Sequence, residues 1–312
     1  MEQQSESHKP KDLFLYPGNL FEKDMIGIVL ALLSAAASGF SVVLVSKHNM
    51  KSSAFNMSLL ISLVGLVILW PLAIILTDFA AADLLGIALF AVGGMLTPGL
   101  VRLLYYNGLK KLGTSVNSSI FSVYPLYSSL LAVLFLSEIL TIENWIGVFS
   151  VILGVVFVET NFREKNGGHS SLSKGLVFPL LGGLTLGAST LLRKSALNLY
   201  NAPVLGIAVA YTFSFLPYAI VLALHQQTRK ELSLKNDLRL FWVAGVGQAV
   251  SWILSFYALS LDKVSIIAPL LSIEPLFVVL LAYLYLRELE HVSSKLAASI
   301  LLTVFGVILV TT

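Results

Sequence analysis

Cysteine is absent from the 312-residue chain. Its absence excludes disulfide bonds, thiolate metal sites and cysteine nucleophiles, and leaves the cellular compartment open. Histidine is also sparse, and the five copies, at positions 8, 48, 169, 225 and 291, fall in the predicted tail or loops. A Ser–His dyad or a histidine metal cluster inside an apolar segment is therefore not expected. The chain also lacks a G-x-x-x-x-G-K-[ST] loop, which argues against ATP hydrolysis by that route.

Charged side chains make up 12% of the residues, where a soluble domain carries about 25%. Hydrophobic residues make up 57%, and the mean hydropathy is +0.87. A water-soluble fold of this size could not bury so much apolar surface, so we expect the lipid bilayer to be the solvent. The net charge of +3 is spread along the loops and forms no basic face for nucleic acid. We expect no cofactor, no metal and no nucleic-acid partner.

Ten apolar segments, each near the ~20 residues that cross a bilayer, follow a flexible tail at 1–24. Each is expected to be a helix, because a spanning segment must satisfy its own backbone hydrogen bonds. We place them near 25–46, 55–77, 84–108, 115–136, 143–160, 175–197, 203–224, 239–261, 264–286 and 293–311. For the first segment a signal peptide is the alternative, since Ile26–Leu33 precedes small residues. Its apolar run continues through Val45, which favours a retained helix.

A fourteen-residue sequence occurs twice, as PLYSSLLAVLFLSE from Pro125 to Glu138 and as PLFVVLLAYLYLRE from Pro275 to Glu288. Eight of the fourteen positions are identical at an offset of 150, which indicates an internal duplication. The polar linker 161–174 then divides the chain into five-helix repeats at 25–160 and 175–312. Because five is odd, the second repeat enters the membrane from the opposite side. The prediction is an all-α integral membrane protein with ten transmembrane helices in two inverted repeats. A monomer would suffice, since one chain holds both repeats.

The orientation of the termini stays open. Thirteen Lys and Arg residues fall in loops on the side opposite the termini. The six counted on the side of the termini are Lys9, Lys11, Lys23, Arg193, Lys194 and Lys263. The positive-inside rule would place both termini outside the cytoplasm, whereas related ten-span carriers are usually drawn with cytoplasmic termini.

Seven prolines lie inside the apolar segments. Five of them, Pro98 included, are expected to form ordinary kinks that neighbouring helices repair. Pro125 and Pro275 occupy matching places in the two halves, so they are expected to mark broken helices beside a midplane site. Glu138 and Glu288 close their segments and are expected to tie a loop or a neighbouring helix at the membrane interface.

Polar side chains at membrane depth supply the candidate site. Glu274 precedes Pro275 and aligns with Tyr124 of the first half. Placing a carboxylate at this depth in the membrane costs about 2.5–3.5 kcal/mol of insertion free energy, so its side chain should face a cavity or a partner. Glu274 is also the candidate for proton coupling. The alternative is a structural hydrogen bond to a nearby hydroxyl. Further candidates for solute contact in the fourth and ninth segments are Asn117, Ser122 and Ser272.

Arg102 is a cation in the third segment. Either its side chain snorkels to the interface, or it pairs with Glu274 or binds an anionic group of the solute. Its counterpart in the second half is Trp252, which lies one helical turn from Gln248. These two side chains either line the interior or pack in the core.

The stretch YALSLDKVSIIAPLLSIEPLFVVLLAYLYLRE at 257–288 resembles the EamA repeat of the drug/metabolite transporter superfamily. The stretch at 106–138 is similar but looser, with Tyr124 in place of the acidic residue before the proline. The resemblance implies two five-helix bundles around a central cavity in the cell membrane, and a carrier of a small organic solute such as an amino acid, sugar, nucleoside or drug. We expect alternating access around a cavity formed by segments 1, 3, 4, 6, 8 and 9. An intramembrane enzyme and a channel-like pore are the alternatives, although no filter or ring of charge favours a pore.

Overall fold

The structure is a computed structural model of the chain. It describes residues 20–48, 53–112, 117, 120–121, 123–165, 175–226, 234–286 and 294–311. These residues are almost entirely helical and contain no strand, so the predicted all-α class is confirmed. The calls for Ser122 and Glu288, and most of the linker 161–174, lie outside the described residues.

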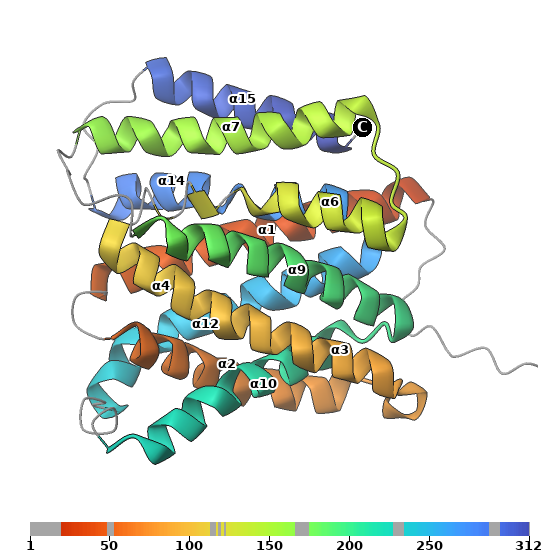
Figure 1. Ribbon diagram of the computed structural model, residues 1–312, viewed down its shortest axis with the longest axis vertical. Coiled ribbons are helices and arrows are strands. Elements are labelled where there is room, and N and C mark those ends of the chain that lie inside the picture. Colours follow the sequence, from red (N-terminus) through yellow and green to blue (C-terminus); the bar gives the residue numbers. More distant parts are fainter. Residues whose placement is uncertain are drawn as a thin grey trace, which may run out of the picture.

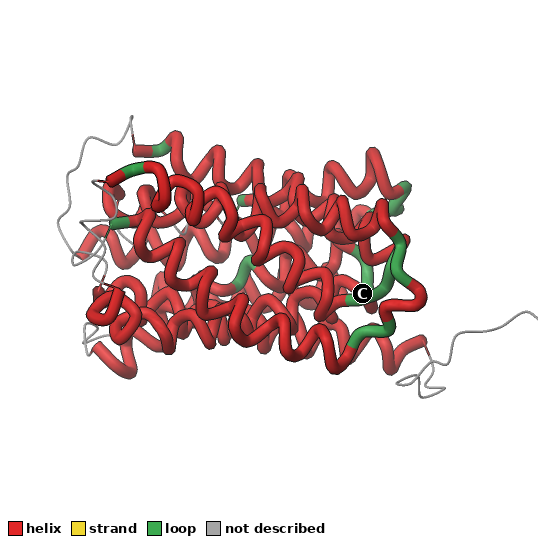
Figure 2. Tube along the Cα trace, turned by 90° about the horizontal axis from the view of Figure 1, so that it is seen from below, coloured by secondary structure: helices red, strands yellow, loops and turns green. Residues whose placement is uncertain are grey.

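The helices lie side by side as a bundle, with connecting segments at its two ends (Figures 1 and 2). The first half of the chain contains α1 (Leu20–His48), α2 (Ala54–Leu76), η2 (Phe79–Ala81), α3 (Leu84–Gly94), η3 (Met95–Leu100), α4 (Val101–Leu112), α6 (Tyr124–Leu136) and α7 (Ile142–Lys165). The second contains α9 (Val177–Leu199), α10 (Pro203–Leu224), α12 (Leu234–Leu261), α13 (Val264–Leu271), α14 (Glu274–Leu286) and α15 (Ser294–Thr311).

Five helical stretches among the described residues are long and apolar enough to cross a membrane. They are Met25–Val45, Ala54–Leu76, Leu84–Leu112, Pro203–Leu224 and Phe241–Leu261. Shorter apolar stretches occur in α6, α7, α13–α14 and α15. By length and composition the chain therefore has several membrane-spanning helices.

The third and the ninth predicted segments are interrupted. Between α3 and α4, Thr97 has extended dihedrals (φ −143°, ψ 121°), because the ring of Pro98 disfavours a helical conformation for the residue before it. The sequence led us to expect only a kink at Pro98; the extended Thr97 makes it a local interruption of the helix. Between α13 and α14, the helix turns at Ser272 and Ile273, and Pro275 falls in the first turn of α14, where its missing N–H costs no hydrogen bond. Pro125 has the same place in α6.

Helices from the two halves pack directly on each other. α1 packs on α12 and α14, and α9 packs on α3, α4 and α6. α2 contacts α10, while α7 and α15 form a pair at one edge (Figure 1). An added Cβ at Gly306 would lie 2.6 Å from the Val151 backbone nitrogen, so small residues allow the close approach of α7 and α15.

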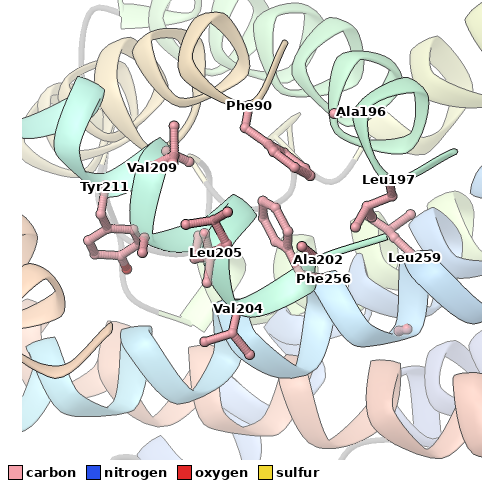
Figure 3. Packing of buried hydrophobic residues seen from close by; sticks show 14 of the residues in the cluster. Phe90, Ala196, Leu197, Ala202, Val204, Leu205, Val209, Tyr211, Phe256 and Leu259 are labelled. Carbon is pink, nitrogen blue, oxygen red and sulfur yellow. The ribbon is translucent and has the colours of Figure 1, made fainter. Parts of the chain in front are cut away.

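The largest hydrophobic cluster lies among α1, α2, α3, α6, α9, α10, α12 and α13. Figure 3 shows Phe90 and Phe256 facing each other within it, with ring centroids 6.0 Å apart. Leu197 of α9 and Leu259 of α12 fill the neighbouring space (Figure 3). Phe256 also packs against Trp252, a residue of the cavity described below.

Candidate functional site

A cavity of about 140 Å³ lies among α1, η3, α4, α6, α9, α12, α13 and α14. It therefore draws its lining from both halves of the chain, and from each of the six segments that the sequence placed around a cavity. The lining combines aromatic rings, hydroxyl groups, two arginines and one glutamate. Of the eight predicted contact residues, the structure places six on this lining: Arg102, Tyr124, Gln248, Trp252, Ser272 and Glu274.

Glu274 begins α14 and is held from the opposite helix. The Ser38 hydroxyl of α1 donates to Glu274 Oε2 at 2.6 Å, and Gln248 Nε2 of α12 donates to Ser38 Oγ at 3.2 Å. One turn away, Ser34 and Ser251 exchange hydroxyl-to-carbonyl hydrogen bonds of 2.8 and 2.9 Å. The result is a polar seam that joins α1 to α12 and ends at the carboxylate.

Tyr124 and Ser272 are already engaged by the protein backbone. The Tyr124 hydroxyl donates to the Ala268 carbonyl at 3.0 Å, which braces α6 against α13. The Ser272 hydroxyl donates to the Pro269 carbonyl at 2.7 Å. Tyr124 lines the cavity and its hydroxyl hydrogen is already engaged, so we expect its contribution to a solute contact to be mainly apolar.

Asn117 does not line the cavity. Its side chain is fully buried, and Nδ2 donates to the Tyr105 carbonyl at 3.1 Å. The amide sits so close to Gly108 that any larger residue there would overlap it. Asn117 therefore holds its own segment against α4. The sequence pattern of the helix does not show that its side chain faces α4 and not the cavity.

Arg102 is buried, with 6% of its surface exposed, so the snorkelling alternative is wrong. Its guanidinium donates to Ser62 Oγ at 2.7 Å and to the Tyr211 hydroxyl at 3.1 Å, and it lies 5.2 Å from the Tyr211 ring centroid. Among the described residues no ion pair joins Arg102 to Glu274. Arg102 instead ties α4 to α2 and α10 with neutral partners.

Arg193 is the site residue that the sequence analysis missed. The sequence analysis counted it among the loop cations on the side of the termini. The structure places it inside α9, with 2% of its surface exposed. The number of loop cations on that side was therefore too high by one residue. Its Nη2 donates to Thr190 Oγ1 at 2.8 Å. The guanidinium lies 4.7 Å from the Trp252 ring centroid and 5.5 Å from that of Phe256. The signal was available, because Arg193 lies within the predicted segment 175–197, and a cation there has the same cost as Arg102.

Thr97 supplies an unused hydroxyl. It lies on the interrupted η3 segment, is 2% exposed, and lines the cavity. Its Oγ1 has no hydrogen-bond partner in the described part of the chain. A buried hydroxyl without a partner carries a desolvation cost that a bound solute would relieve.

Glu138 lies away from the cavity, just past the end of α6. α6 ends at Ser137 in the left-handed conformation (φ 55°), and the chain then carries Glu138 to the start of α13. There Oε1 accepts from the Val264 N–H at 2.9 Å and Oε2 from the Ser265 N–H at 3.0 Å. The carboxylate from the first half thus caps a helix of the second.

Comparisons with known proteins agree with this architecture. A model of the EamA-like transporter family matches residues 25–160 and again 173–312. An uncharacterized transporter from Archaeoglobus fulgidus is 24% identical over 289 residues, which cover 91% of this chain and 98% of that protein. A solved crystal structure, described only as that of a protein, has 16% identity and a TM-score of 0.70 over 93% of this chain and 98% of its own, a likeness in fold alone. With the apolar helices, the family match confirms a multi-pass integral protein of the cell membrane.

Proposed function

Because the chain belongs to the EamA-like transporter family, we propose that it is a secondary carrier that moves a small organic solute by alternating access around the cavity. That it is a membrane transporter follows from the family and from the transporter relative, and both are consistent with a protein that is not an enzyme. The proposal adds alternating access as the mechanism, the cavity as the solute site and the coupling of transport to a proton gradient. The observation that carries it is the cavity itself, which places two arginines and a glutamate on a buried lining drawn from both halves of the chain.

The pattern of helix packing supports two inverted repeats. α1 of the first half packs on α12 and α14, and its counterpart α9 packs on α3, α4 and α6. The contacts of α1 with the second half and of α9 with the first half therefore correspond, with the roles of the halves exchanged. Corresponding helices of the two halves also contact each other directly: α2 packs on α10, and α7 packs on α15. Two such halves rocking about a shared midplane site is the expected behaviour of an inverted-repeat carrier.

Glu274 is the coupling residue in this proposal. It is the cavity's carboxylate, its partner is a hydroxyl, and no ion pair neutralises it among the described residues. A side chain that exchanges a proton as the cavity changes sides would link the proton gradient to solute movement. The two arginines keep their charge at all physiological pH values and cannot take this role.

The direct test is a flux screen with purified protein in liposomes. Labelled amino acids, sugars, nucleosides, organic anions and cationic drugs are offered with and without a pH gradient. The proposal expects saturable movement of one class and loss of its pH dependence in Glu274→Gln. An absence of flux for every class, with protein shown to be folded and inserted, would contradict the carrier function. Flux whose pH dependence survives Glu274→Gln would contradict the coupling role alone.

The inverted topology has its own test, which the absence of cysteine makes simple. Leu84→Cys, at the start of α3, and His225→Cys, at the end of α10, place single thiols at opposite ends of the bundle. A membrane-impermeant maleimide should label one from outside and the other only after permeabilisation. Labelling of both from the same side would exclude the proposed topology.

A further inference from the structure

We propose that the solute carries a carboxylate or a comparable planar anionic group, and that Arg193 is the residue that recognises it. This inference rests on the proposed function, since it names the chemical class that the same cavity accepts. It begins from the charges on the lining. Two guanidinium groups and one carboxylate face the cavity, and among the described residues no ion pair links them.

The three charged groups differ in how far the protein itself satisfies them. Glu274 accepts a short hydrogen bond from Ser38, which in turn accepts from Gln248. Arg102 donates to two hydroxyl groups on two other helices and lies near the Tyr211 ring. Both charges are therefore anchored by side chains of neighbouring helices, and each contributes to holding the bundle together.

Arg193 is held differently. Its hydrogen bonds in the described part of the chain are to Thr190 Oγ1 at 2.8 Å and to the Ser189 carbonyl at 3.4 Å, both on its own helix. A guanidinium group has five N–H donors, so these two bonds leave most of its donor capacity for another acceptor. On α12, the protein offers it the rings of Trp252 and Phe256 instead of an anion.

Stacking on an aromatic ring fixes the plane of the guanidinium and leaves its N–H edge free to donate. Two parallel donors in a fixed plane match the two oxygens of a carboxylate. Aromatic residues that line the same cavity, Tyr105, Phe121 and Tyr124 among them, suit an apolar or aromatic body attached to that group. The Thr97 hydroxyl, which has no partner in the described residues, adds a further donor on the lining.

Three planar molecules of nearly identical shape separate charge from size. Benzoate is an anion, benzamide is neutral and benzamidine is a cation. Their binding to the full-length protein in lipid nanodiscs is measured by isothermal titration calorimetry. The proposal expects benzoate to bind about tenfold or more tightly than benzamide, and benzamidine to bind most weakly, because hydrogen bonds to a charged donor add about 1.5–3 kcal/mol. Equal binding of all three, or a preference for benzamidine, would overturn it without any variant.

Two variants assign the preference to one side chain. Arg193→Gln should abolish the preference for benzoate over benzamide. Arg193→Lys keeps the charge but loses the planar fork, and should weaken benzoate binding about fivefold while retaining the order. Arg239→Gln removes the same charge from an exposed position on α12 and should leave binding unchanged. If Arg193→Gln does not fold, unchanged benzoate affinity in Arg193→Lys would still overturn the assignment.

The outcome is distinguishable from failure of the carrier function. Benzoate binding that depends on Arg193, in a protein that moves no solute across liposomes, would contradict transport and leave the assignment of anion binding to Arg193 intact. Transport of an uncharged or cationic solute with unchanged rates in Arg193→Lys would contradict the inference and leave transport intact.

Discussion

The guanidinium carbon of Arg193 lies 4.7 Å from the centroid of the Trp252 ring. Arg193 lies on α9 and Trp252 on α12, and both residues line the cavity, so this contact joins two of the helices that form its wall. Because Trp252 also packs toward Phe256, at a centroid distance of 6.3 Å, the stack connects the site to the largest hydrophobic cluster.

Trp252→Ala should therefore weaken benzoate binding. A cation–π contact contributes about 0.5–2 kcal/mol, which corresponds to about a twofold to thirtyfold loss of affinity. Trp252→Phe keeps a ring over the guanidinium and should lose less. Titration calorimetry of the two variants beside the wild type measures both effects, and equal losses would show that the ring does not orient Arg193.

The presence of the helices and the segments that form the cavity could be predicted from the sequence, because hydropathy and the internal repeat are patterns that extend over many residues. Side-chain partners could not. Tyr124 was expected to meet a solute, and its hydroxyl instead reaches the Ala268 carbonyl across the repeat interface. Arg193 was assigned to a loop because it lies near the C-terminal end of its predicted helix. The aromatic rings that enclose it belong to α12, and their position next to Arg193 results from tertiary packing, which the sequence does not show.

Gly65 should not tolerate alanine. A Cβ at this position on α2 would overlap the ring of Tyr211, whose hydroxyl accepts from Arg102. Overpacking of a close-packed site costs about 1–3 kcal/mol, so Gly65→Ala should lower the thermal unfolding temperature in detergent. Gly183→Ala is the matched control, since its nearest neighbour would lie 3.5 Å away, an ordinary contact. Equal melting of the two variants would mean that Tyr211 moves aside at no cost.

The seam between α1 and α12 should contribute modestly to stability. Ser34 and Ser251 exchange two hydrogen bonds to each other's carbonyl groups. Double-mutant cycles in another membrane protein give a mean coupling of about 0.6 kcal/mol for such pairs, with a maximum near 1.7. The cycle of Ser34→Ala, Ser251→Ala and the double variant, measured by reversible unfolding in mixed micelles, should fall in this range. A coupling near zero would show that each hydroxyl finds an equivalent acceptor on its own helix.

Glu138 should control access to the cavity from the end of the bundle where α12 turns into α13. Its carboxylate caps Val264 and Ser265, while the Lys194 ammonium of α9 donates to the Leu259 carbonyl at 2.7 Å and the Asp262 carbonyl at 2.8 Å. These bonds hold the turn against α6 and α9. If the proposed alternating access opens the cavity at this end, we expect these bonds to break. Loss of a helix cap costs about 0.5–2 kcal/mol, and 1 kcal/mol changes an equilibrium about fivefold.

In the natural cysteine-free sequence, Ser255→Cys places one thiol on the cavity lining. Adding Glu138→Gln should raise the rate at which an impermeant thiol reagent labels it from that end by about fivefold. Glu143→Gln, which removes the same charge from a fully exposed position at the start of α7, is the control and should leave the rate unchanged. If both substitutions leave labelling unchanged while Glu138→Gln lowers the unfolding temperature, the cap stabilises the fold and does not hold that end of the cavity closed.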